Sequence, residues 1–315
     1  MASLLRIATR TSPLALWQAE YVSDALRQHH PDLTIELVKL VTRGDKILDV
    51  ALSKIGGKGL FIKELELALQ ENRADLAVHS MKDVPMALAP EFVLPVICPR
   101  GEPGDALVSN HYRTVSALPQ GAVVGTSSLR RQAQLLAARP DLKIEFLRGN
   151  VGTRLSKLDA GQYDAIILAA AGLERLGLHE RIAEKLDYDL CLPACGQGAV
   201  GIECRTGDAR TQALIAPLDD PHTHVRLSAE RAMNRRLNGG CEVPIAGYTW
   251  LTDDLNLRLE GRIAWPTGEG LIKVSAATQL TGLADHAAAE ALGLAVAEQM
   301  LTKGASPILQ HLDRL

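Results

Sequence analysis

Short apolar runs alternate with stretches whose apolar residues recur at helical spacing over most of the chain. The apolar run at residues 4–9 predicts a strand, and the spacing over residues 14–26 predicts a helix. Between them, Ser12 suits the N-cap of that helix and Pro13 suits its first turn. The same order of strand, polar junction and helix recurs in residues 121–136, 144–158 and 163–178. Such repeats predict largely parallel sheets covered by helices on both faces, with ligands beyond the carboxyl ends of the strands.

A glycine-rich segment interrupts the first part of this pattern. After a second alternating strand at residues 33–42, residues 43–62 contain four glycines and no clear period. Long loops of this kind are commonly mobile, so we expect a flexible segment that can cover a cleft. A helix at residues 62–72 and a short strand at 76–78 follow. That strand leads into the polar sequence HSMKDVP, residues 79–85.

Proline and glycine gather at residues 92–105, where we expect the chain to cross between domains. Residues 192–205 are a candidate for the return path. From residue 221 the pattern changes to a small α+β domain with an antiparallel sheet, and its elements are expected at residues 225–237, 245–251, 255–264, 270–277 and 283–301. We therefore expect three domains, formed by residues 1–98 with 199–216, residues 104–192 and residues 221–315.

The composition excludes several classes of protein. The 315 residues are 47% hydrophobic, yet no apolar run approaches the roughly 20 residues of a membrane span. A formal charge of −3 and an aromatic content of 3% argue against nucleic acid as a partner. Arg6 interrupts the amino terminus before an export signal forms, and the five cysteines lack paired spacing. We therefore expect a cytoplasmic protein with reduced thiols and no membrane or nucleic-acid partner.

Arginines recur at the predicted junctions between strands and helices. A helix N-terminus carries unpaired N–H donors and partial positive charge, so an added cation there is unfavourable unless an anion lies between them. A single arginine of this kind would be an ordinary surface residue beside a cap, but the arrangement is repeated. We therefore predict a cleft for a ligand with several acidic groups. The junction residues are Arg10 with Ser12, Ser127 and Ser128 with Arg130 and Arg131, Arg148 with Arg154, and Arg175 after Gly172.

Asp83 follows Lys82 just past the strand predicted at residues 76–78. A carboxylate in this place suits proton transfer or stabilisation of a transient cation, and a solvated Lys-Asp turn is the alternative. We predict no metal site, because the paired histidines and three of the cysteines lack further ligands at useful spacing. These residues are His29 with His30, His222 with His224, and Cys191, Cys195 and Cys204.

Cys241 follows Gly239 and Gly240, and Pro244 comes three residues later. The glycines remove side-chain bulk beside the sulfur and the proline fixes the chain that leaves it, so a large group can approach and be attached. The helix predicted at residues 225–237 ends nearby, and a helix carboxyl terminus destabilises a thiolate. A hydrolase-type nucleophile is therefore disfavoured. A buried structural cysteine on a turn is the alternative.

Five longer motifs, spread from the first strand to the last domain, point to one family. They are RIATRTSPLALWQA, HSMKDVP, GTSSLRRQ, LRGNVGTRL and ERAMNRRLNGGCEVPIAG. Together, and in this order, they resemble the hallmarks of the porphobilinogen deaminase family, whose members are also called hydroxymethylbilane synthases. The last motif, residues 230–247, is similar to the family's cofactor-attachment signature. The resemblance covers essentially the whole chain.

This resemblance implies two doubly wound, periplasmic-binding-protein-like α/β domains plus a small α+β domain with a three-stranded antiparallel sheet. It implies a transferase that joins four porphobilinogen molecules head to tail on a covalently bound dipyrromethane primer and releases ammonia. Hydrolysis then frees the linear tetrapyrrole hydroxymethylbilane, a step of haem biosynthesis. A cytoplasmic monomer is also implied.

The resemblance also assigns residues by matching motifs. It implies that Cys241 carries the dipyrromethane and that Asp83 with Lys82 is catalytic. Each porphobilinogen brings an acetate and a propionate, which accounts for several arginines. The implied cofactor-binding residues are Cys241, Arg10, Ser12, Lys82, Asp83, Thr126, Ser128, Arg130, Arg131, Arg154 and Gly172; the substrate-binding residues are Arg10, Arg148, Arg154, Arg175 and Gln197; the flexible segment contains Asp45, Lys58 and Phe61.

A two-lobed module that binds an anion or senses an effector, without catalysis, is the alternative from another class of protein. It explains the arginines equally well. It does not explain Cys241 on its glycine turn, nor a third domain. A cysteine hydrolase would additionally need a histidine close to Cys241.

Overall fold

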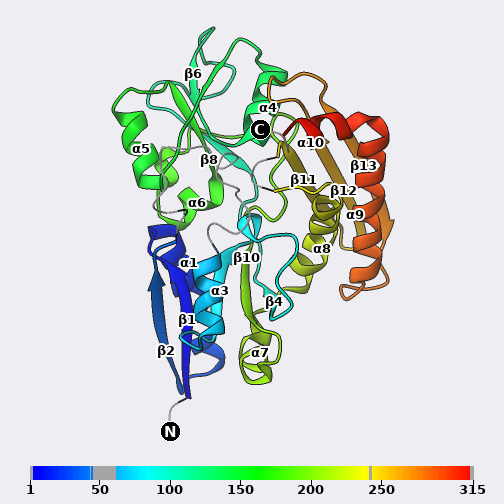
Figure 1. Cartoon of the computed structure of the whole chain (residues 1–315). Helices are drawn as coiled ribbons and strands as arrows, with labels where there is room; N and C mark the ends of the chain where they lie inside the picture. The colour runs from blue at the N-terminus through cyan, green and yellow to red at the C-terminus, as the bar shows by residue number, and fades with distance from the viewer. Residues whose placement is uncertain (1–2, 43, 45–61, 241–242, 313–315) are drawn as a thin grey trace.

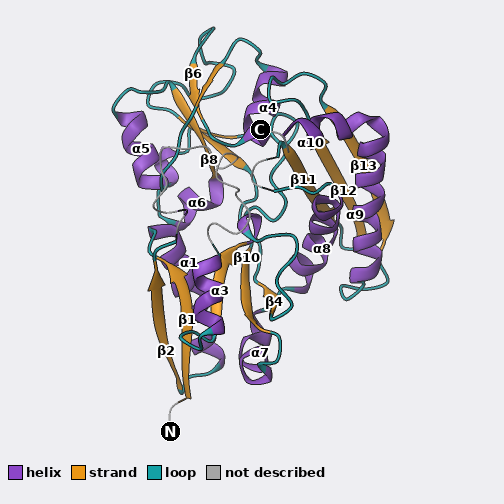
Figure 2. Cartoon of the chain, viewed as in Figure 1, coloured by secondary structure: helices purple, strands orange, loops and turns teal. Residues whose placement is uncertain are grey.

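The computed structural model describes residues 3–42, 44, 62–240 and 243–312, which form three bodies around three separate sheets (Figure 1, Figure 2). In Figure 1 the first body, with the N-terminus, lies at the bottom, the second above it and the third beside both. The predicted fold class is confirmed: two doubly wound α/β bodies accompany a small α+β body. None of the described helices combines the length and the apolar character that crossing a bilayer requires.

The first sheet contains, in order, β2 (Leu33–Leu40), β1 (Ser3–Arg10), β3 (Leu76–Ser80), β10 (Val200–Arg205) and β4 (Phe92–Ile97). It is covered by α1 (Pro13–His29), α3 (Lys63–Gln70) and α7 (Ala209–Ile215). Because side chains alternate along a strand, Leu5 and Ile7 of β1 pack with α1, whereas Ala8 packs with α3 on the opposite face. The sheet is therefore a layer between helices.

The second sheet contains, in order, β7 (Lys143–Glu145), β6 (Val123–Gly125), β8 (Ala165–Ala169), β5 (Asp105–Val108) and β9 (Glu184–Lys185). Its helices are α4 (Leu129–Ala138), α5 (Val151–Asp159) and α6 (Ala170–Arg175). Ile167 packs with the α4 side, and its neighbours Ile166 and Leu168 pack with α5 and α6. This sheet, too, is covered on both faces.

Both five-stranded sheets are mixed, so the prediction of largely parallel sheets is wrong for half of their strand pairs. The strands of the strand-helix units are parallel, but β10 and β5 run opposite to their neighbours. β5 follows the outward crossing, residues 98–104, and β10 follows the return crossing, residues 192–199. Since these two strands enter from the other body rather than through a crossover helix, nothing forces them to be parallel. The return path suggested for residues 192–205 is confirmed by the pairing of β10 with β3 and β4.

The two crossings touch where Gly101 meets Gly198. Gly101 N donates to Gly198 O at 3.0 Å. Gly198 has a φ of 87°, and a Cβ there would lie 2.8 Å from Gly101 O, so this position requires glycine. The first and second bodies are thus connected by two backbones in direct contact.

The third body contains β11 (Ile245–Leu251), β12 (Asn256–Ile263) and β13 (Ile272–Gln279) with α8 (Pro221–Arg236), α9 (His286–Met300) and α10 (Ser306–Leu312). Its antiparallel three-stranded sheet is as predicted. α8 starts before the predicted residue 225, because Asp220 caps it and accepts from Thr223 N at 2.6 Å. Gly293 of α9 lies so close to Ala229 O of α8 that a side chain would overlap it.

A buried ion pair joins the third body to the crossings. Arg100 donates through both Nη atoms to Glu230 of α8, at 2.6 and 3.1 Å. Glu230 also accepts from Gly196 N at 2.7 Å and from Thr249 Oγ1 at 2.8 Å. Breaking a buried pair of this kind typically costs about 3–5 kcal/mol. Glu230 therefore fixes α8 against both crossings at once.

Candidate active site

The polar junctions of the first two bodies meet at the boundary between them. α1 begins just after β1 ends, α6 begins where β8 ends, and the two helices lie against each other (Figure 1). Gly172 of α6 lies at this contact: a Cβ there would be 3.6 Å from Leu14 of α1 and 3.9 Å from Val151 of α5. Ligands of open α/β sheets bind at such strand ends.

Polar side chains at three junctions cap the helices that follow, which fixes the positions of the neighbouring arginines. The predicted N-cap role of Ser12 is confirmed. Thr126 is buried and accepts from Ser128 N at 3.2 Å, which orders the turn before α4. The capping bonds are Ala15 N to Ser12 Oγ (3.4 Å), Arg131 N to Ser128 Oγ (3.5 Å) and Thr153 N to Asn150 Oδ1 (2.9 Å).

Arg130 and Arg131, in the first turn of α4, both bind Asp105 at the start of β5. Arg130 Nη1 lies 2.7 Å from Asp105 Oδ2, and Arg131 Nη2 lies 2.8 Å from Oδ1. All three side chains are buried. Burial would raise the pKa of Asp105, but the two guanidiniums outweigh it and hold that pKa well below its usual range. We call these three residues the arginine fork.

Arg154 lies in strongly positive surroundings. Its Nε donates to Gly149 O at 2.7 Å. The pKa of Arg154 falls to about 10, mainly because of burial and further because Arg131 and Arg148 repel its charge, while Asp83 opposes the shift. Burial also lowers the pKa of Arg148. Cations that lower one another's pKa indicate an excess of positive charge, which suits an acidic ligand.

Lys82 and Asp83 belong to a single 3₁₀ turn, η2 (Met81–Asp83), directly after β3. Met81 N donates to Ala199 O at 3.0 Å, which ties the turn to the return crossing. Burial lowers the pKa of Lys82, with Asp83 opposing and Arg131 adding to the shift. Gly196 of the return crossing packs against Met81 and Lys82, and the next residue, Gln197, donates to Asp105, so this turn lies near the arginine fork of the second body. The structure thus brings the predicted catalytic pair and four predicted arginines together.

Arg175 and Gln197 form hydrogen bonds at the two crossings between the first and second bodies. Arg175 Nη2 donates to Gly198 O at 2.6 Å, and its guanidinium lies 5.2 Å from the ring centre of Trp17 on α1. Burial lowers the pKa of Arg175. Gln197 Nε2 donates to Pro103 O at 2.7 Å and to Asp105 Oδ1 at 2.9 Å. Arg10 is the last residue of β1 and is half-buried at the same boundary.

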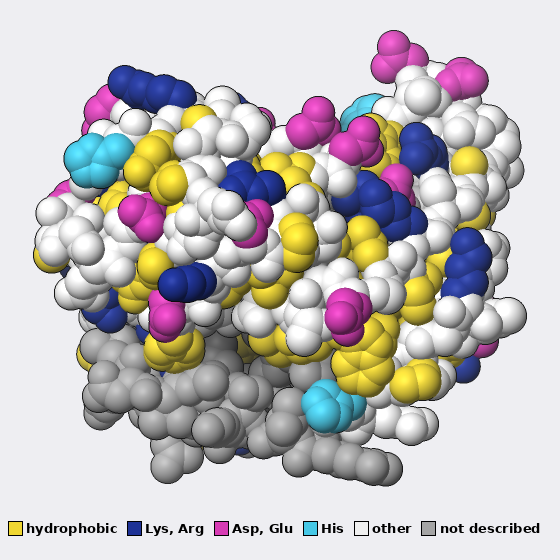
Figure 3. Space-filling model, turned by 90° about the horizontal axis from the view of Figure 1, so that it is seen from above, with side chains coloured by type: hydrophobic (Ala, Val, Ile, Leu, Met, Phe, Trp, Pro, Cys, Tyr) yellow, Lys and Arg dark blue, Asp and Glu magenta, His cyan; other side chains and the backbone are white. Residues whose placement is uncertain are grey.

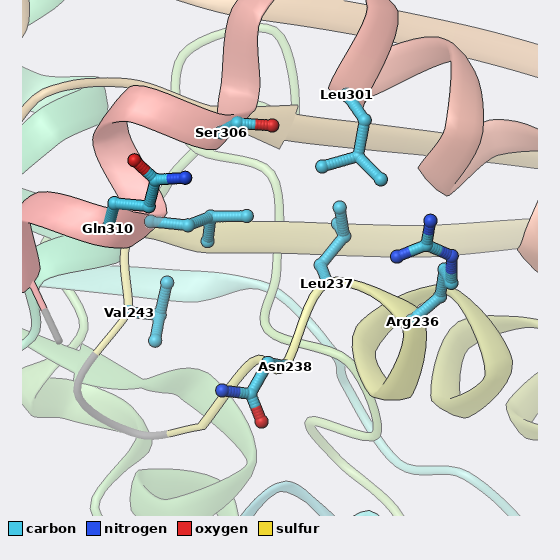
Figure 4. A pocket seen from close by; sticks show the side chains of 8 residues that line it. Arg236, Leu237, Asn238, Val243, Leu301, Ser306 and Gln310 are labelled. Carbon is cyan, nitrogen blue, oxygen red and sulfur yellow. The ribbon is translucent and has the colours of Figure 1, made fainter.

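Four of the residues named from the sequence lie outside the described residues: Cys241, Asp45, Lys58 and Phe61. The chain on either side of Cys241 is described, with α8 ending at Arg236 and β11 beginning at Ile245. A hollow of about 170 Å³ lies beside Asn238 and Val243. Figure 4 draws the side chains that line it: Arg236, Leu237, Asn238, Val243, Leu301, Ser306, Leu309 and Gln310. This volume is below the roughly 300 Å³ at which small-molecule sites typically begin.

The four described cysteines, Cys98, Cys191, Cys195 and Cys204, are buried free thiols. Burial raises the pKa of Cys98 and of Cys191 to about 12 and that of Cys204 to about 11. Such thiols are almost wholly protonated at neutral pH and are unsuited to attack a substrate. Over the described ranges, no group of three or more His, Cys, Asp or Glu side chains is arranged to hold a metal ion.

Asp105 and Trp17 belong to this site but do not stand out in the sequence as binding residues. Asp105 begins an apolar strand, and a charged residue that begins a buried strand needs a partner. This need for a partner was the signal in the sequence, but the two partners, Arg130 and Arg131, are 25 and 26 positions away. Trp17 lies within the regular apolar spacing of its helix, so its contact with Arg175 leaves no mark in the pattern.

The fold and the site define a class of protein: two α/β lobes with several arginines and a Lys-Asp pair at the boundary between them. Residues 5–213 match the model of the family described as "Porphobilinogen deaminase, dipyromethane cofactor binding domain", and residues 225–302 match "Porphobilinogen deaminase, C-terminal domain". The chain belongs to the porphobilinogen deaminase family. It is accordingly a transferase with a dipyrromethane cofactor, which makes hydroxymethylbilane from four molecules of porphobilinogen.

Solved structures with a similar arrangement include two proteins titled as binding proteins and one sensor-named domain, BvgS VFT2. The probable amino-acid ABC transporter extracellular-binding protein ytmK from Bacillus subtilis is 12% identical with a TM-score of 0.43, over 69% of this chain and 90% of that one. The BvgS VFT2 domain of Bordetella pertussis is 16% identical with a TM-score of 0.42, over 67% and 84%. The aliphatic sulphonate binding protein SsuA of Escherichia coli is 17% identical with a TM-score of 0.40, over 76% and 71%.

Proposed function

We propose that this chain carries its dipyrromethane through a thioether to Cys241 and holds the acidic side chains of cofactor and substrate with the arginines between the first two bodies. The cluster of buried arginines, Arg130, Arg131 and Arg148, beside Arg154 is the observation that supports this proposal, since Asp105 offsets only part of its charge. Charge-assisted hydrogen bonds from arginine to a carboxylate are worth about 1.5–3 kcal/mol each, and the planar guanidinium matches the two carboxylate oxygens.

The described residues fit a dipyrromethane. Its carboxylates match the surplus cations, and its pyrrole N–H groups are donors that require acceptors. Gln197 Oε1 is such an acceptor: it is buried and has no donor among the described residues. When bound, dipyrromethane supplies the pyrrole carbon to which the first substrate is joined.

Asp83 is the proposed acid-base residue, and Lys82 beside it is proposed to keep that carboxylate ionised. Loss of ammonia from porphobilinogen leaves a positive charge on the pyrrole nitrogen. Asp83 stabilises this charge and helps to pass a proton to the leaving amine, a role that typically contributes about 10² to 10⁴ in rate.

The remaining assignments belong to the same proposal. Cofactor contacts are assigned to Arg10, Ser12, Thr126, Ser128, Arg130, Arg131, Arg154 and Gly172, and substrate contacts to Arg10, Arg148, Arg154, Arg175 and Gln197. We further propose that the three bodies are domains formed by residues 1–98 with 199–216, residues 104–192 and residues 221–315, which agrees with the membership of their sheets.

A cytoplasmic monomer is proposed as well. The four described cysteines are all free thiols, which suits a reducing compartment. On the face shown in Figure 3, hydrophobic side chains are interspersed with charged ones. The exposed large hydrophobic residues of the described chain come from separate elements, as is normal for a monomer surface: Leu4, Val41, Leu67, Phe146 and Leu294.

The mass of the intact purified protein tests the thioether. We expect the wild-type protein to exceed its polypeptide mass by two porphobilinogen units less two ammonias, and Cys241→Ala to have the bare polypeptide mass. The matched control is Cys204→Ala, which removes a buried thiol from β10 and should leave the added mass in place.

An unmodified wild-type protein that still forms product would contradict attachment at Cys241.

A further inference from the structure

Asp105 occupies the point where the outward crossing enters the second body. It is the first residue of β5 and is fully buried, with an exposed fraction of 0%. A carboxylate taken out of water is costly unless its oxygens are fully hydrogen-bonded. The donors around it therefore decide what this residue does.

Both oxygens of Asp105 accept hydrogen bonds, and the donors come from two separate segments. Oδ2 accepts from Arg130 Nη1 at 2.7 Å and from the Cys191 thiol at 3.3 Å. Oδ1 accepts from Arg131 Nε at 3.0 Å and Nη2 at 2.8 Å, and from Gln197 Nε2 at 2.9 Å. The two arginines belong to α4, and the other two donors belong to the segment that leads into and through the return crossing.

Each guanidinium of the arginine fork also donates a hydrogen bond to a backbone carbonyl. Arg130 Nη1 also donates to Leu192 O at 2.8 Å, and Arg131 Nη1 donates to Ile167 O at 3.0 Å. Their orientation is therefore set by the protein before any ligand arrives. Two positive charges against one negative charge leave the fork with a net charge of +1, so it still attracts an acidic group.

We infer that Asp105 is a positioning residue, which orients Arg130 and Arg131 for the acidic groups of the primer and couples them to the return crossing through Gln197. This inference rests on the proposal that these arginines bind the cofactor. Groups fixed in advance bind without a further loss of side-chain freedom, so the effect should appear in binding more than in the chemical step.

The test compares Asp105→Asn with Asp75→Asn. Asp75 is a matched buried aspartate that binds Arg6 Nη2 at 2.8 Å and Nε at 3.1 Å, at the opposite end of β3 from Asp83. Primer content is measured by intact mass and by an aldehyde colour reaction per mole of folded protein, together with kcat, KM and the thermal midpoint. In Asp105→Asn the amide offers one acceptor where two arginines need one each. We expect its primer content to fall or its KM to rise about tenfold or more, the range typical of lost supporting contacts. Asp75→Asn should lower only the thermal midpoint.

Two further variants separate the possible outcomes. Asp105→Glu keeps the charge but shifts the carboxylate by one methylene, and it replaces Asp105→Asn in the test if Asp105→Asn does not fold. The inference is overturned if the folded variant used in the test has normal primer content and a KM within twofold of wild type. Arg131→Gln examines the underlying proposal. If Arg131→Gln is impaired and a folded Asp105→Asn is not, the positioning role is wrong and the arginine site stands. If neither variant is impaired, the assignment of the arginines to the cofactor is itself wrong.

Discussion

Asp83 and Asp105 are two carboxylates that lie close to the same cations but differ in their surroundings. Asp105 is fully buried, and its two oxygens accept hydrogen bonds from side chains that include both arginines of the fork. Its two guanidinium partners hold its pKa well below the usual range, which favours the charged form. Asp83 lies half-buried in a short turn after β3, where a substrate can reach it. This difference agrees with the roles proposed above, positioning for Asp105 and proton transfer for Asp83.

Asp83→Asn tests this division of roles. The amide has the same shape but can neither carry the charge nor transfer the proton, so we expect kcat to fall by about 10² to 10⁴. The rate is measured per mole of primer-loaded protein, with loading checked by mass, and the thermal midpoint should change little. Asp141→Asn, at a surface pair with Arg139, is the control and should keep normal kcat. A rate for Asp83→Asn within threefold of wild type would remove the proposed catalytic role.

At the scale of elements, the local patterns predicted the strand-helix units correctly. The N-cap at Ser12, the three antiparallel strands of the third body and most helix positions follow from residues within one or two turns of each other. These features could be read from the sequence because neighbouring residues determine them. Cap residues also marked the junctions where the arginines lie, so much of the candidate site could be expected.

What the sequence could not reveal depends on contacts between distant segments. β10 pairs with β3 across more than a hundred residues, and nothing within residues 192–205 indicates its direction or its place in the sheet. The burial of Arg130 and Arg131 against Asp105 is of the same kind. The sequence pattern predicted arginines whose charge is available to a ligand. In the structure, Asp105 neutralises part of the charge of Arg130 and Arg131.

The contact between α8 and α9 predicts a dependence of stability on pH. His286, at the start of α9, lies 4.9 Å from His224 of α8 by ring centroids, and Ser228 Oγ lies 2.9 Å from His286 Nδ1. Burial and the nearby His224 lower the pKa of His286, although Asp219 opposes the shift. The unfolded chain therefore takes up this proton at a higher pH than the folded chain. The contribution of His286 is fully present above about pH 6.5 and declines as the pH falls through the lowered value.

Thermal unfolding at about pH 8 and about pH 5.5 checks this dependence. We expect the midpoint to be lower at the acidic pH, and the difference to be smaller in His286→Gln, whose amide keeps a partner for Ser228. His111→Gln, at an exposed position, is the control and should behave as wild type. An equal drop in all three proteins would show that other groups cause it.

At the scale of the whole molecule, the two crossings are the connection between the first and second bodies. The third body is fixed to these crossings through α8. The crossings touch at Gly101 and Gly198, and Glu230 holds α8 against both of them. The product grows by one ring at a time and needs more room at each step. Two bodies that are joined only by a narrow connection can provide this room by moving apart. We therefore expect the two α/β bodies to change their relative position as rings are added.

Small-angle X-ray scattering measures this movement. Protein that carries three added pyrrole rings should give a profile distinct from that of protein with the primer alone, with a larger radius of gyration. The control is Cys241→Ala mixed with the same amount of substrate, whose profile should stay constant. Superimposable profiles for zero and three added rings would mean that the product is accommodated without rearrangement of the bodies.

The position of β10 in the first sheet has a consequence for how the chain is synthesised. In the described part of the chain, the only strand that pairs with β4 is β10, which also joins it to β3. All strands of the second sheet have been translated by Lys185, whereas the first sheet waits until Arg205. The body that begins at the N-terminus is thus the later of the two to be completed on the ribosome. Until then the nascent chain presents an open strand edge, the kind of surface that chaperones cover and that aggregation exploits.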